Sequence, residues 1–527
     1  MLKLPAEPIF SHSTGHIALT RRHALGLMLG AGLASAFANN PAFAQDAAVS
    51  GGILKVSASN NPSSLDPITG RSGYDHAMLY PIFDTLFEFD FQTLQPKPGL
   101  AKAWNYTDPK TLVIDLNENV VFHDGTPFDA EAVKFNLERA LTLENSAVKT
   151  DLASIESVEV ASPTQVVLHL KNPDSSLILV LADRSGMMVS PTAARAQGEA
   201  FARNPVGAGR WAFVSWTDNA KVVVKRNEKY WRDGQPYLDG IEFTIIPELN
   251  TGLRSVIAGE NDLVYQISLQ QEPIIKSNSD ISATILPSLN IHMLYLNMSR
   301  PPFNDKRVRQ ALNFAIDRQA FNQITRDGEP TWTLLPKEHW ACDPGLANAY
   351  PYDPEKAKAL LAEAGLSGGL DLFCMGWNDQ KAVQRQEILI EQFRQVGIRA
   401  RFETASVADS TQLFMSEKRG DAYLGAFTGR PDPSQVFQRL FDPNSVVNAG
   451  RVDPVPERAA AQLATQTAQT LVDRQKAFFA LQKLVSENAL CVPITVQHDV
   501  TVFTNKVVGF RPNLTGKPKF EDVSLKA

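Results

Sequence analysis

A serine within a Gly-x-Ser-x-Gly pattern is the clearest candidate for a reactive side chain in this sequence. The pattern is Gly365-Leu366-Ser367-Gly368-Gly369. A nucleophilic serine of this kind needs a strand before it and a helix after it, because that turn exposes the hydroxyl at the end of a sheet. Here a helical pattern comes first and a strand pattern follows. The glycines are better explained as the end of a helix and a loop, so we expect no catalytic serine.

The histidines do not form a metal site in the sequence. His123 lies in the turn-like segment His-Asp-Gly-Thr-Pro, His292 lies within a strand pattern, and His339 and His498 are far apart. No two histidines have metal-ligand spacing on one element. The sequence also lacks HExxH, GxxxxGK[ST] and GxGxxG. We therefore predict no catalytic residue, no metal and no cofactor.

The three cysteines exclude a disulfide scaffold and a zinc site built from four cysteines. They are Cys342, Cys374 and Cys491. Cys374 and Cys491 lie in apolar, strand-like runs, which favours buried and unreactive thiols.

The composition is that of a globular protein that does not bind nucleic acid. The chain has 527 residues, of which 44% are hydrophobic and 20% are charged, with a net charge of −6. Residues 1–44 contain three cations and one anion, so the remaining chain has a net charge of −8. A general nucleic-acid binder needs a basic face for the phosphates. The length indicates two to four domains at about 150 residues each.

The first 45 residues have the pattern of an export signal. Positive charge at Thr20-Arg21-Arg22-His23 precedes an apolar run from Ala24 to Ala38, and Ala42-Phe43-Ala44 forms a cleavage site before Gln45. The run is shorter than the roughly 20 residues of a membrane span. The paired arginines resemble a twin-arginine signal, and an ordinary secretory signal is the alternative. We predict a signal peptide over 1–44 and a mature protein in the periplasm, where kinase and dehydrogenase cofactors are not supplied.

Strand and helix patterns alternate along the rest of the chain, which predicts an α/β fold. Strands are expected at Ile53–Val56, Leu112–Leu116, Val166–Leu170, Lys221–Lys225, Ile241–Ile246 and Ile291–Leu296. Helices are expected after the capping residues Asp129, Asp305 and Asp353, and over Arg385–Val396 and Arg474–Val485. Pro354 suits the first helical position after Asp353, and Gly365 suits the end of that helix.

Several long motifs occur in a fixed order. They are Gly51–Val56 with Ser64-Leu65-Asp66-Pro67, Val121-Phe122-His123-Asp124-Gly125-Thr126-Pro127-Phe128 continuing to Val133, Asn204–Trp211, and Asn297 followed by Pro302–Leu312. In this order the sequence resembles the family 5 extracellular solute-binding proteins of ABC importers, over about 90% of the mature chain. The turn and cap residues within these motifs indicate that they are parts of the scaffold, so we do not expect them to contact a ligand.

The resemblance implies a fold like that of type II periplasmic binding proteins, with two lobes, or three regions, around a ligand cleft. The first lobe would consist of 46–83, 207–290 and 500–527, with an inserted domain at 84–206, and the second lobe of 291–499. Proteins of this kind close on their ligand by hinge bending. Such a mechanism needs no catalytic residue.

The resemblance also indicates where the ligand's charge is recognised. In peptide-binding members an Asp after a Gly-Trp segment pairs with the ligand's amino terminus. The comparable stretch here is Gly425–Pro433, with Phe427 at the Trp position and Arg430 at the Asp position. A guanidinium repels an ammonium but pairs well with a carboxylate. Two alternatives stay open: Asp432 restores an amine site if the loop shifts, or Arg430 only forms a salt bridge with Asp432 or Asp421.

Four further residues are expected to be ligand-binding. Tyr74 follows the Ser64–Pro67 loop, Trp377 and Asn378 follow a strand, and Arg184 lies on the inserted domain. Aromatic walls with one or two arginines suit a small anionic organic solute. For each of these residues a surface or core role is the alternative.

The sequence therefore predicts the periplasmic binding component of an ABC importer, and not an enzyme. Its ligand would be a small solute, either peptide-like or an anionic organic compound. Its partners would be an inner-membrane permease and its ATPase, and the protein would be a monomer. An exported peptide receptor or chaperone on the same fold, or an exported hydrolase, are the alternatives.

Export should remove the first 44 residues. We expect N-terminal sequencing of the periplasmic protein to begin at Gln45. A mature form that still contains Arg21 and Arg22 would contradict this. If the twin-arginine route is used, replacing both arginines by lysine should leave the precursor in the cytoplasm.

Overall fold

The computed structural model describes residues 49–70 and 72–526. The predicted signal peptide at 1–44 lies outside these residues. The described chain alternates helices and strands, as the sequence predicts.

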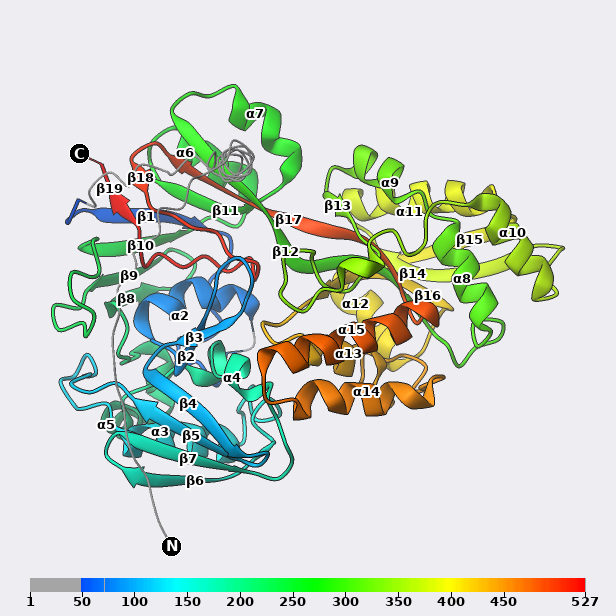
Figure 1. Ribbon diagram of the computed structural model, residues 1–527. Helices are drawn as coiled ribbons and strands as arrows, with labels where there is room; N and C mark the ends of the chain where they lie inside the picture. The colour runs from blue at the N-terminus through cyan, green and yellow to red at the C-terminus, as the bar shows by residue number, and fades with distance from the viewer. Residues whose placement is uncertain (1–48, 71, 527) are drawn as a thin grey trace, which may run out of the picture. The chain divides into compact units, whose positions relative to one another are not determined.

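The strands of the described chain form one large sheet and three smaller ones (Figure 1). The order of the large sheet is β15-β14-β16-β12-β17-β11-β1-β10-β9-β8, and β13 pairs with β17 beside it. Its strands are β1 (Ile53–Ala58), β8 (Trp211–Thr217), β9 (Lys221–Arg226), β10 (Gly240–Ile245), β11 (Leu263–Ile267), β12 (Ile281–Leu296), β13 (Gly328–Pro330), β14 (Leu370–Trp377), β15 (Ile398–Ala405), β16 (Ala422–Thr428) and β17 (Val492–Thr504).

Two long strands in the middle of this sheet join two lobes. We call the group β1, β8, β9, β10 and β11 the first lobe and the group β14, β15 and β16 the second lobe, each with the elements packed on it. Figure 1 shows β12 and β17 running side by side from one group to the other. They pair antiparallel from Ile281 with Thr504 to Leu294 with Val492. The predicted boundaries at 290/291 and 499/500 both fall inside these strands.

A register shift interrupts the β12–β17 pairing at the crossing. Pro287 pairs with His498 and Ile291 with Val496, so three residues of β12 face one residue of β17. The extra backbone groups are satisfied elsewhere: the Leu289 N–H donates to the Leu514 carbonyl at 2.8 Å, and the Leu289 carbonyl accepts from the Gly429 N–H at 2.9 Å. An irregularity of this kind bends a strand and increases its twist.

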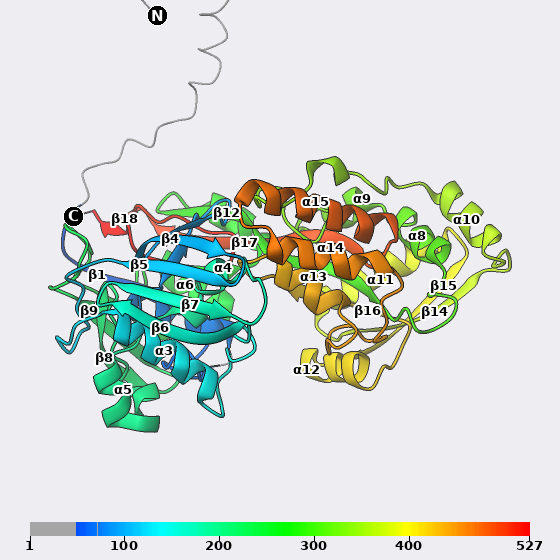
Figure 2. The same cartoon turned by 60° about the horizontal axis from the view of Figure 1, so that its bottom comes forward.

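The remaining sheets belong to the first lobe. The four-stranded sheet β4-β5-β7-β6 consists of β4 (Ala101–Asp108), β5 (Thr111–Leu116), β6 (Ile155–Ser162) and β7 (Gln165–Leu170). Figure 2 shows α3 beside this sheet, and its contacts with β6 and β7 place it on one face. Two small sheets pair β2 (Phe87–Phe89) with β3 (Pro96–Pro98), and β18 (Val507–Val508) with β19 (Ser524–Leu525).

The helices cover the faces of these sheets. In the first lobe, α6 packs on β1, β11 and β17, and α2 packs on β8 and β9. In the second lobe, α11 and α12 pack on β14 and β15. The helices are α2 (His76–Ile82), α3 (Ala130–Thr142), α4 (Leu177–Val180), α5 (Pro191–Gln197), α6 (Leu249–Ile257), α7 (Glu272–Lys276), α8 (Lys306–Phe314), α9 (Arg318–Thr325), α10 (Pro354–Glu363), α11 (Gln380–Arg394), α12 (Val407–Thr411), α13 (Ser434–Phe441), α14 (Pro456–Thr467) and α15 (Leu471–Glu487).

The predicted helix caps are confirmed. Asp129 accepts from the N–H of Ala132 at 2.9 Å, Asp305 from that of Arg307 at 2.8 Å, and Asp353 from that of Lys356 at 2.9 Å. Each carboxylate satisfies an N–H that has no partner within its helix. Three predicted starts come too late by three residues or more. The helix expected at Arg385 begins at Gln380, because Asp379 caps it, and the helix expected at Arg474 begins at Leu471, because Thr470 caps it. The strand expected at Ile291 begins at Ile281.

Two of the sequence motifs hold each other in place. The two motifs are joined by the His123 N–H, which donates to the Gly207 carbonyl at 2.8 Å. The second motif also packs against the end of α2, because the Gly209 N–H donates to the Ile82 carbonyl at 2.9 Å. A Cβ added at Gly207 would lie 2.1 Å from the Ile82 oxygen, so the close approach of the two backbones requires glycine there. These contacts give both motifs a role in the scaffold.

Candidate functional site

A cavity of about 1100 Å³ lies between the two lobes. Its volume is at the upper end of the range of small-molecule sites. The first lobe contributes the segments around His76, Val148 and Lys517, and the second lobe contributes parts of β12, β14, β16 and α13. None of the described residues of the sequence motifs at 121–133, 204–211 and 302–312 lines it.

Aromatic side chains from three neighbouring strands form the second-lobe wall. Tyr295 on β12 and Tyr423 on β16 are cross-strand partners, with ring centroids 5.5 Å apart. Trp377, at the end of β14, donates its indole N–H to the hydroxyl of Tyr423. Phe427 lies four residues after Tyr423, so both point to the same side of the sheet. This wall offers flat apolar surface with the hydroxyl of Tyr423 held in a fixed position.

Gly425 leaves room for this arrangement. It lies between Tyr423 and Phe427 on the same side of β16. A Cβ added there would lie 2.7 Å from the ring of Tyr423, so a larger residue would displace the tyrosine.

Two arginines of the second lobe face the cavity without a hydrogen-bond partner for their guanidinium groups among the described residues. Arg430 lies on the loop after β16, and its nearest charge is Asp151 of the first lobe, 3.7 Å from Nη1 to Oδ2. Arg439 lies on α13, and its guanidinium makes no ion pair or hydrogen bond with any residue in 49–70 or 72–526. Burial and the positive charge of Arg430 together lower the pKa of Arg439. Both guanidinium groups line the same cavity, and the carboxylate of Asp151 lies opposite Arg430.

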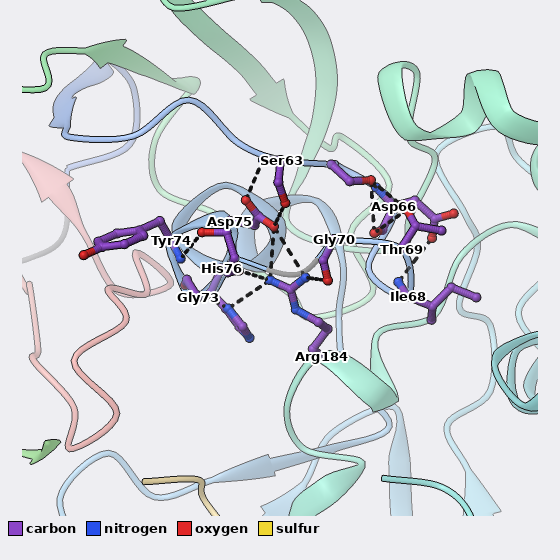
Figure 3. Close-up of polar contacts among 12 residues, drawn as sticks. Ser63, Asp66, Ile68, Thr69, Gly70, Gly73, Tyr74, Asp75, His76 and Arg184 are labelled. Atoms are coloured by element: carbon purple, nitrogen blue, oxygen red, sulfur yellow. Dashed lines mark hydrogen bonds and ion pairs between the residues drawn. The ribbon is translucent and has the colours of Figure 1, made fainter. Parts of the chain in front are cut away.

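Arg184 lines the cavity from the first lobe, but its donors are used within the protein (Figure 3). Its guanidinium donates to the carbonyls of Gly70 and Ser72, and contacts Asp75 Oδ2 at 3.4 Å through both Nη atoms. Asp75 in turn accepts from the N–H and the hydroxyl of Ser63. Arg184 therefore fixes the loop that borders the cavity and has little capacity left for a ligand.

A second buried network continues from Arg184 towards the C-terminal segment. His76 Nε2 lies 3.0 Å from Asp183 Oδ1, and Lys517 Nζ lies 3.0 Å from Asp183 Oδ2. Burial and the charge of Lys517 lower the pKa of His76 to about 4, so this histidine is neutral near pH 7. Burial alone would raise the pKa of Asp183, but Lys517 and His76 hold it well below its ordinary value. Lys517 Nζ also lies 3.1 Å from His76 Nε2, so one of its three N–H groups remains, and its side chain lines the cavity.

Seven residues were predicted from the sequence to bind the ligand, and the structure brings four of them together. Arg184, Trp377, Phe427 and Arg430 line the cavity. The other three, Tyr74, Asn378 and Asp432, are not among its lining residues.

The three residues outside the lining have different surroundings. Tyr74 is 46% exposed in a short 3₁₀ turn, and Asn378 is exposed after β14. Asp432 is fully buried, where it pairs with Arg474 at 2.9 Å and accepts from the Ser434 N–H at 3.0 Å.

The salt bridge expected between Arg430 and Asp432 or Asp421 is wrong. Asp432 pairs with Arg474, and Asp421 lies 3.3 Å from Arg300. Each of these two acids therefore has its ion-pair partner within the second lobe. Arg430 instead points across the cavity to Asp151.

Sequence reasoning missed Asp151, Tyr295, Tyr423, Arg439 and Lys517. Tyr423 could have been found from strand alternation, because it lies four residues before Phe427 on the same strand. Tyr295 faces the cavity through its pairing with Tyr423, which the sequence does not show. Asp151 and Lys517 lie in irregular segments without a periodic pattern. Only the folded chain brings them to the cavity.

The serine and the cysteines singled out in the sequence do not have the surroundings of reactive groups in the structure. Ser367 lies after α10 and before β14, the reverse of the order that a nucleophilic serine needs. Within residues 49–70 and 72–526, no three His, Cys, Asp or Glu side chains gather as a metal site would require. Cys342, Cys374 and Cys491 are free thiols. Burial raises the pKa of Cys342 to about 11 and that of Cys491 to about 12, which keeps both protonated.

A family model for bacterial extracellular solute-binding proteins, family 5, matches residues 95–448. The chain belongs to this family. The resemblance seen in the sequence motifs is thereby confirmed, and this family 5 protein is a solute-binding protein. None of the helices in its described part is long and apolar enough to cross a membrane. The family's name places its members outside the cytoplasm.

Curated relatives are similar along nearly the whole chain. The glutathione-binding protein GsiB of Salmonella paratyphi A is 29% identical over 518 residues, covering 94% of this chain and 98% of the relative. The GsiB of Escherichia coli O157:H7 is 28% identical over 518 residues with the same coverage.

Solved structures show the same fold, which is that of type II periplasmic binding proteins. HbpA2 from Haemophilus parasuis has a TM-score of 0.81 and 24% identity, covering 90% of this chain and all of that chain. The periplasmic binding protein DppA from Helicobacter pylori, in complex with the peptide STSA, has a TM-score of 0.75 and 20% identity. It covers 91% of this chain and 99% of that chain.

Replacing Asp432 by Asn should destabilise this family 5 protein. The change leaves the guanidinium of Arg474 buried without a counter-charge, which costs about 3–5 kcal/mol. The free energy of unfolding in urea should fall by that amount. The matched control is Asp473→Asn, because Asp473 forms an exposed ion pair with Lys476 at 3.2 Å. This change should lower the free energy of unfolding by less than about 1 kcal/mol. Equal stability of the two variants would contradict the structural role of Asp432.

Proposed function

We propose that this protein is the periplasmic component of an ABC importer, and that it captures a small anionic, peptide-like solute. The observation that carries the proposal is the pair of guanidinium groups, Arg430 and Arg439, that face the cavity and have no hydrogen-bond partner within 49–70 and 72–526. A buried or half-buried guanidinium normally has acceptors. A ligand carboxylate would supply them in bidentate geometry.

The charge balance of the cavity also favours an anion. Asp75 neutralises Arg184, and Asp183 neutralises Lys517, within the first lobe. Among the described residues that line the cavity, two arginines then remain against Asp151 alone. A ligand with a carboxylate would relieve the repulsion between Arg430 and Arg439, and the remaining N–H of Lys517 could bind a second acidic group.

Glutathione is the first compound to test. The relatives at 28–29% identity are named glutathione-binding proteins, and glutathione has two carboxylates and a peptide backbone. Its carboxylates suit the arginines, and its peptide groups suit the aromatic wall of Tyr295, Tyr423 and Trp377. We propose an anionic peptide of this size as the ligand class.

The mechanism that we propose is closure of the two lobes about β12 and β17. The proposed lobes are 46–83, 207–290 and 500–527 with the insertion 84–206, and 291–499. Because only two strands continue between them, with an irregular register at Pro287–Ile291, bending there leaves the rest of each lobe intact. The closed form would deliver the solute to an inner-membrane permease driven by its ATPase. The protein would act as a monomer, without nucleic acid and without turnover.

Replacing Arg430 by Ala should weaken the binding of glutathione. Loss of a charge-assisted, half-buried contact costs about 2–4 kcal/mol, which is on the order of 30- to 1000-fold in affinity. Arg430→Lys should also weaken binding, because an ammonium cannot form the planar, bidentate contact. Calorimetric titration of wild type and variants measures this effect.

The matched control for Arg430 is Arg399→Ala. Arg399 is an exposed arginine of the same lobe that pairs with Asp371 at 2.7 Å. The variant Arg399→Ala should have nearly the same affinity for glutathione and nearly the same melting temperature as wild type. Unchanged affinity in Arg430→Ala would contradict the anion site, and failure of wild type to bind glutathione would remove the proposed ligand class.

Ligand should bring the lobes together and stabilise the fold. Small-angle scattering should show a smaller radius of gyration with glutathione than without it. At about 100-fold excess over Kd, binding adds about 2.7 kcal/mol to the free energy of unfolding, so the melting temperature should rise. A ligand that binds but leaves the radius of gyration unchanged would count against hinge closure.

A further inference from the structure

Asp151 lies opposite the two arginines, and its carboxylate is poorly satisfied. It comes from the first lobe, between α3 and β6, and its side chain is 21% exposed. Its nearest charge is Nη1 of Arg430 at 3.7 Å, which is within ion-pair range but too long for a hydrogen bond. Among the residues that the structure describes, no group donates a hydrogen bond to this carboxylate.

The backbone holds Asp151 at the edge of the cavity. Its N–H donates to the carbonyl of Val148 at 3.0 Å, and the N–H of Ala147 donates to the carbonyl of Ile68 at 2.7 Å. Ala147, Val148 and Asp151 all line the cavity. The side chain therefore meets any solute that lies on Arg430 and Arg439.

The surroundings of Asp151 favour a positively charged partner. Burial raises the pKa of this carboxyl group, and the charges of Arg430 and Arg439 offset only part of that effect. A half-buried carboxylate without a hydrogen-bond donor is costly, and an ammonium group supplies both the charge and the donor. A purely anionic solute would instead leave Asp151 facing another negative charge.

An α-amino acid group has the charge pattern that this side of the cavity lacks. Its carboxylate and its ammonium are bonded to the same carbon, so the two opposite charges stay close together. One such group can therefore reach Arg430 and Asp151, which face each other, at the same time. The carboxylate would take the N–H donors of Arg430 and Arg439, and the ammonium would take the oxygens of Asp151. One α-amino acid group would then supply hydrogen-bond partners to both the carboxylate of Asp151 and the guanidinium of Arg430.

We propose that Asp151 binds the ligand's ammonium group and so selects solutes with a free amine beside a carboxylate. This inference rests on the proposed function, because it assumes that the solute occupies the cavity. In this family's peptide-binding members the resemblance places the amine-binding acid at the position of Arg430, on the second lobe. Here the acid faces the same space from the first lobe.

The experiment compares glutathione with glutaryl-cysteinylglycine, which lacks only the amino group, by calorimetric titration. Wild type should bind the deaminated compound about 10- to 100-fold more weakly than glutathione, as expected for one lost charge-assisted hydrogen bond. Asp151→Asn should lose a similar factor for glutathione and should no longer distinguish the two compounds. The matched control is Asp108→Asn, an exposed acid of the same lobe, which should behave as wild type. Melting curves of each variant show that it is folded.

The possible outcomes separate this inference from the proposed function. If Asp151→Asn discriminates between the two compounds as strongly as wild type does, Asp151 does not recognise the amine. If the variant binds both compounds more tightly, Asp151 only competes with the ligand for Arg430, and the inference is overturned. If wild type binds neither compound, the proposed ligand class fails and this inference fails with it.

Discussion

The antiparallel pairing of β12 with β17 is the constraint on which the rest of the structure depends. These strands take part in both halves of the large sheet, so each lobe is built outward from them. Their pairing is irregular only at Pro287–Ile291 and beside His292. At the first irregularity, Leu289 binds Leu514 of the C-terminal segment and Gly429 of the loop after β16. Two borders of the cavity are thereby tied to the crossing of the lobes.

Four arginines of the two lobes fall into two groups with different tasks. Arg184 and Arg474 have their donors used within one lobe, by carbonyls and by Asp75 or Asp432. Buried pairs of this kind are poor sources of stability but fix the geometry of what they connect, because neither partner can leave alone. Within the described part of their own lobe, the guanidinium groups of Arg430 and Arg439 have no such partner, and Arg430 only makes the long contact with Asp151 of the other lobe. The buried pairs fix the structure of each lobe, and these two arginines can bind a solute.

Much of the fold and part of the site could be predicted from the sequence. Helix caps such as Asp129 and Asp353 act within a few residues, and strand alternation is also local, so both are visible in the chain itself. The family followed from the ordered motifs. Arg430 and Phe427 were found because the resemblance to peptide-binding members places them at ligand-reading positions of the segment Gly425–Pro433. Asp432 looked equally suitable, since burial and a partner 42 residues away cannot be seen in a local pattern.

The sequence by itself determined the elements, the family and the absence of recognised catalytic motifs. The tertiary structure decided which charges meet across the cavity. Asp151 and Arg430 are 279 positions apart, and Lys517 reaches His76 over 441 positions. Such contacts depend on how the lobes pack, which is a property of the whole core and not of any window of the chain. For the same reason, only the structure shows which arginines are paired within their own lobe and which face the cavity.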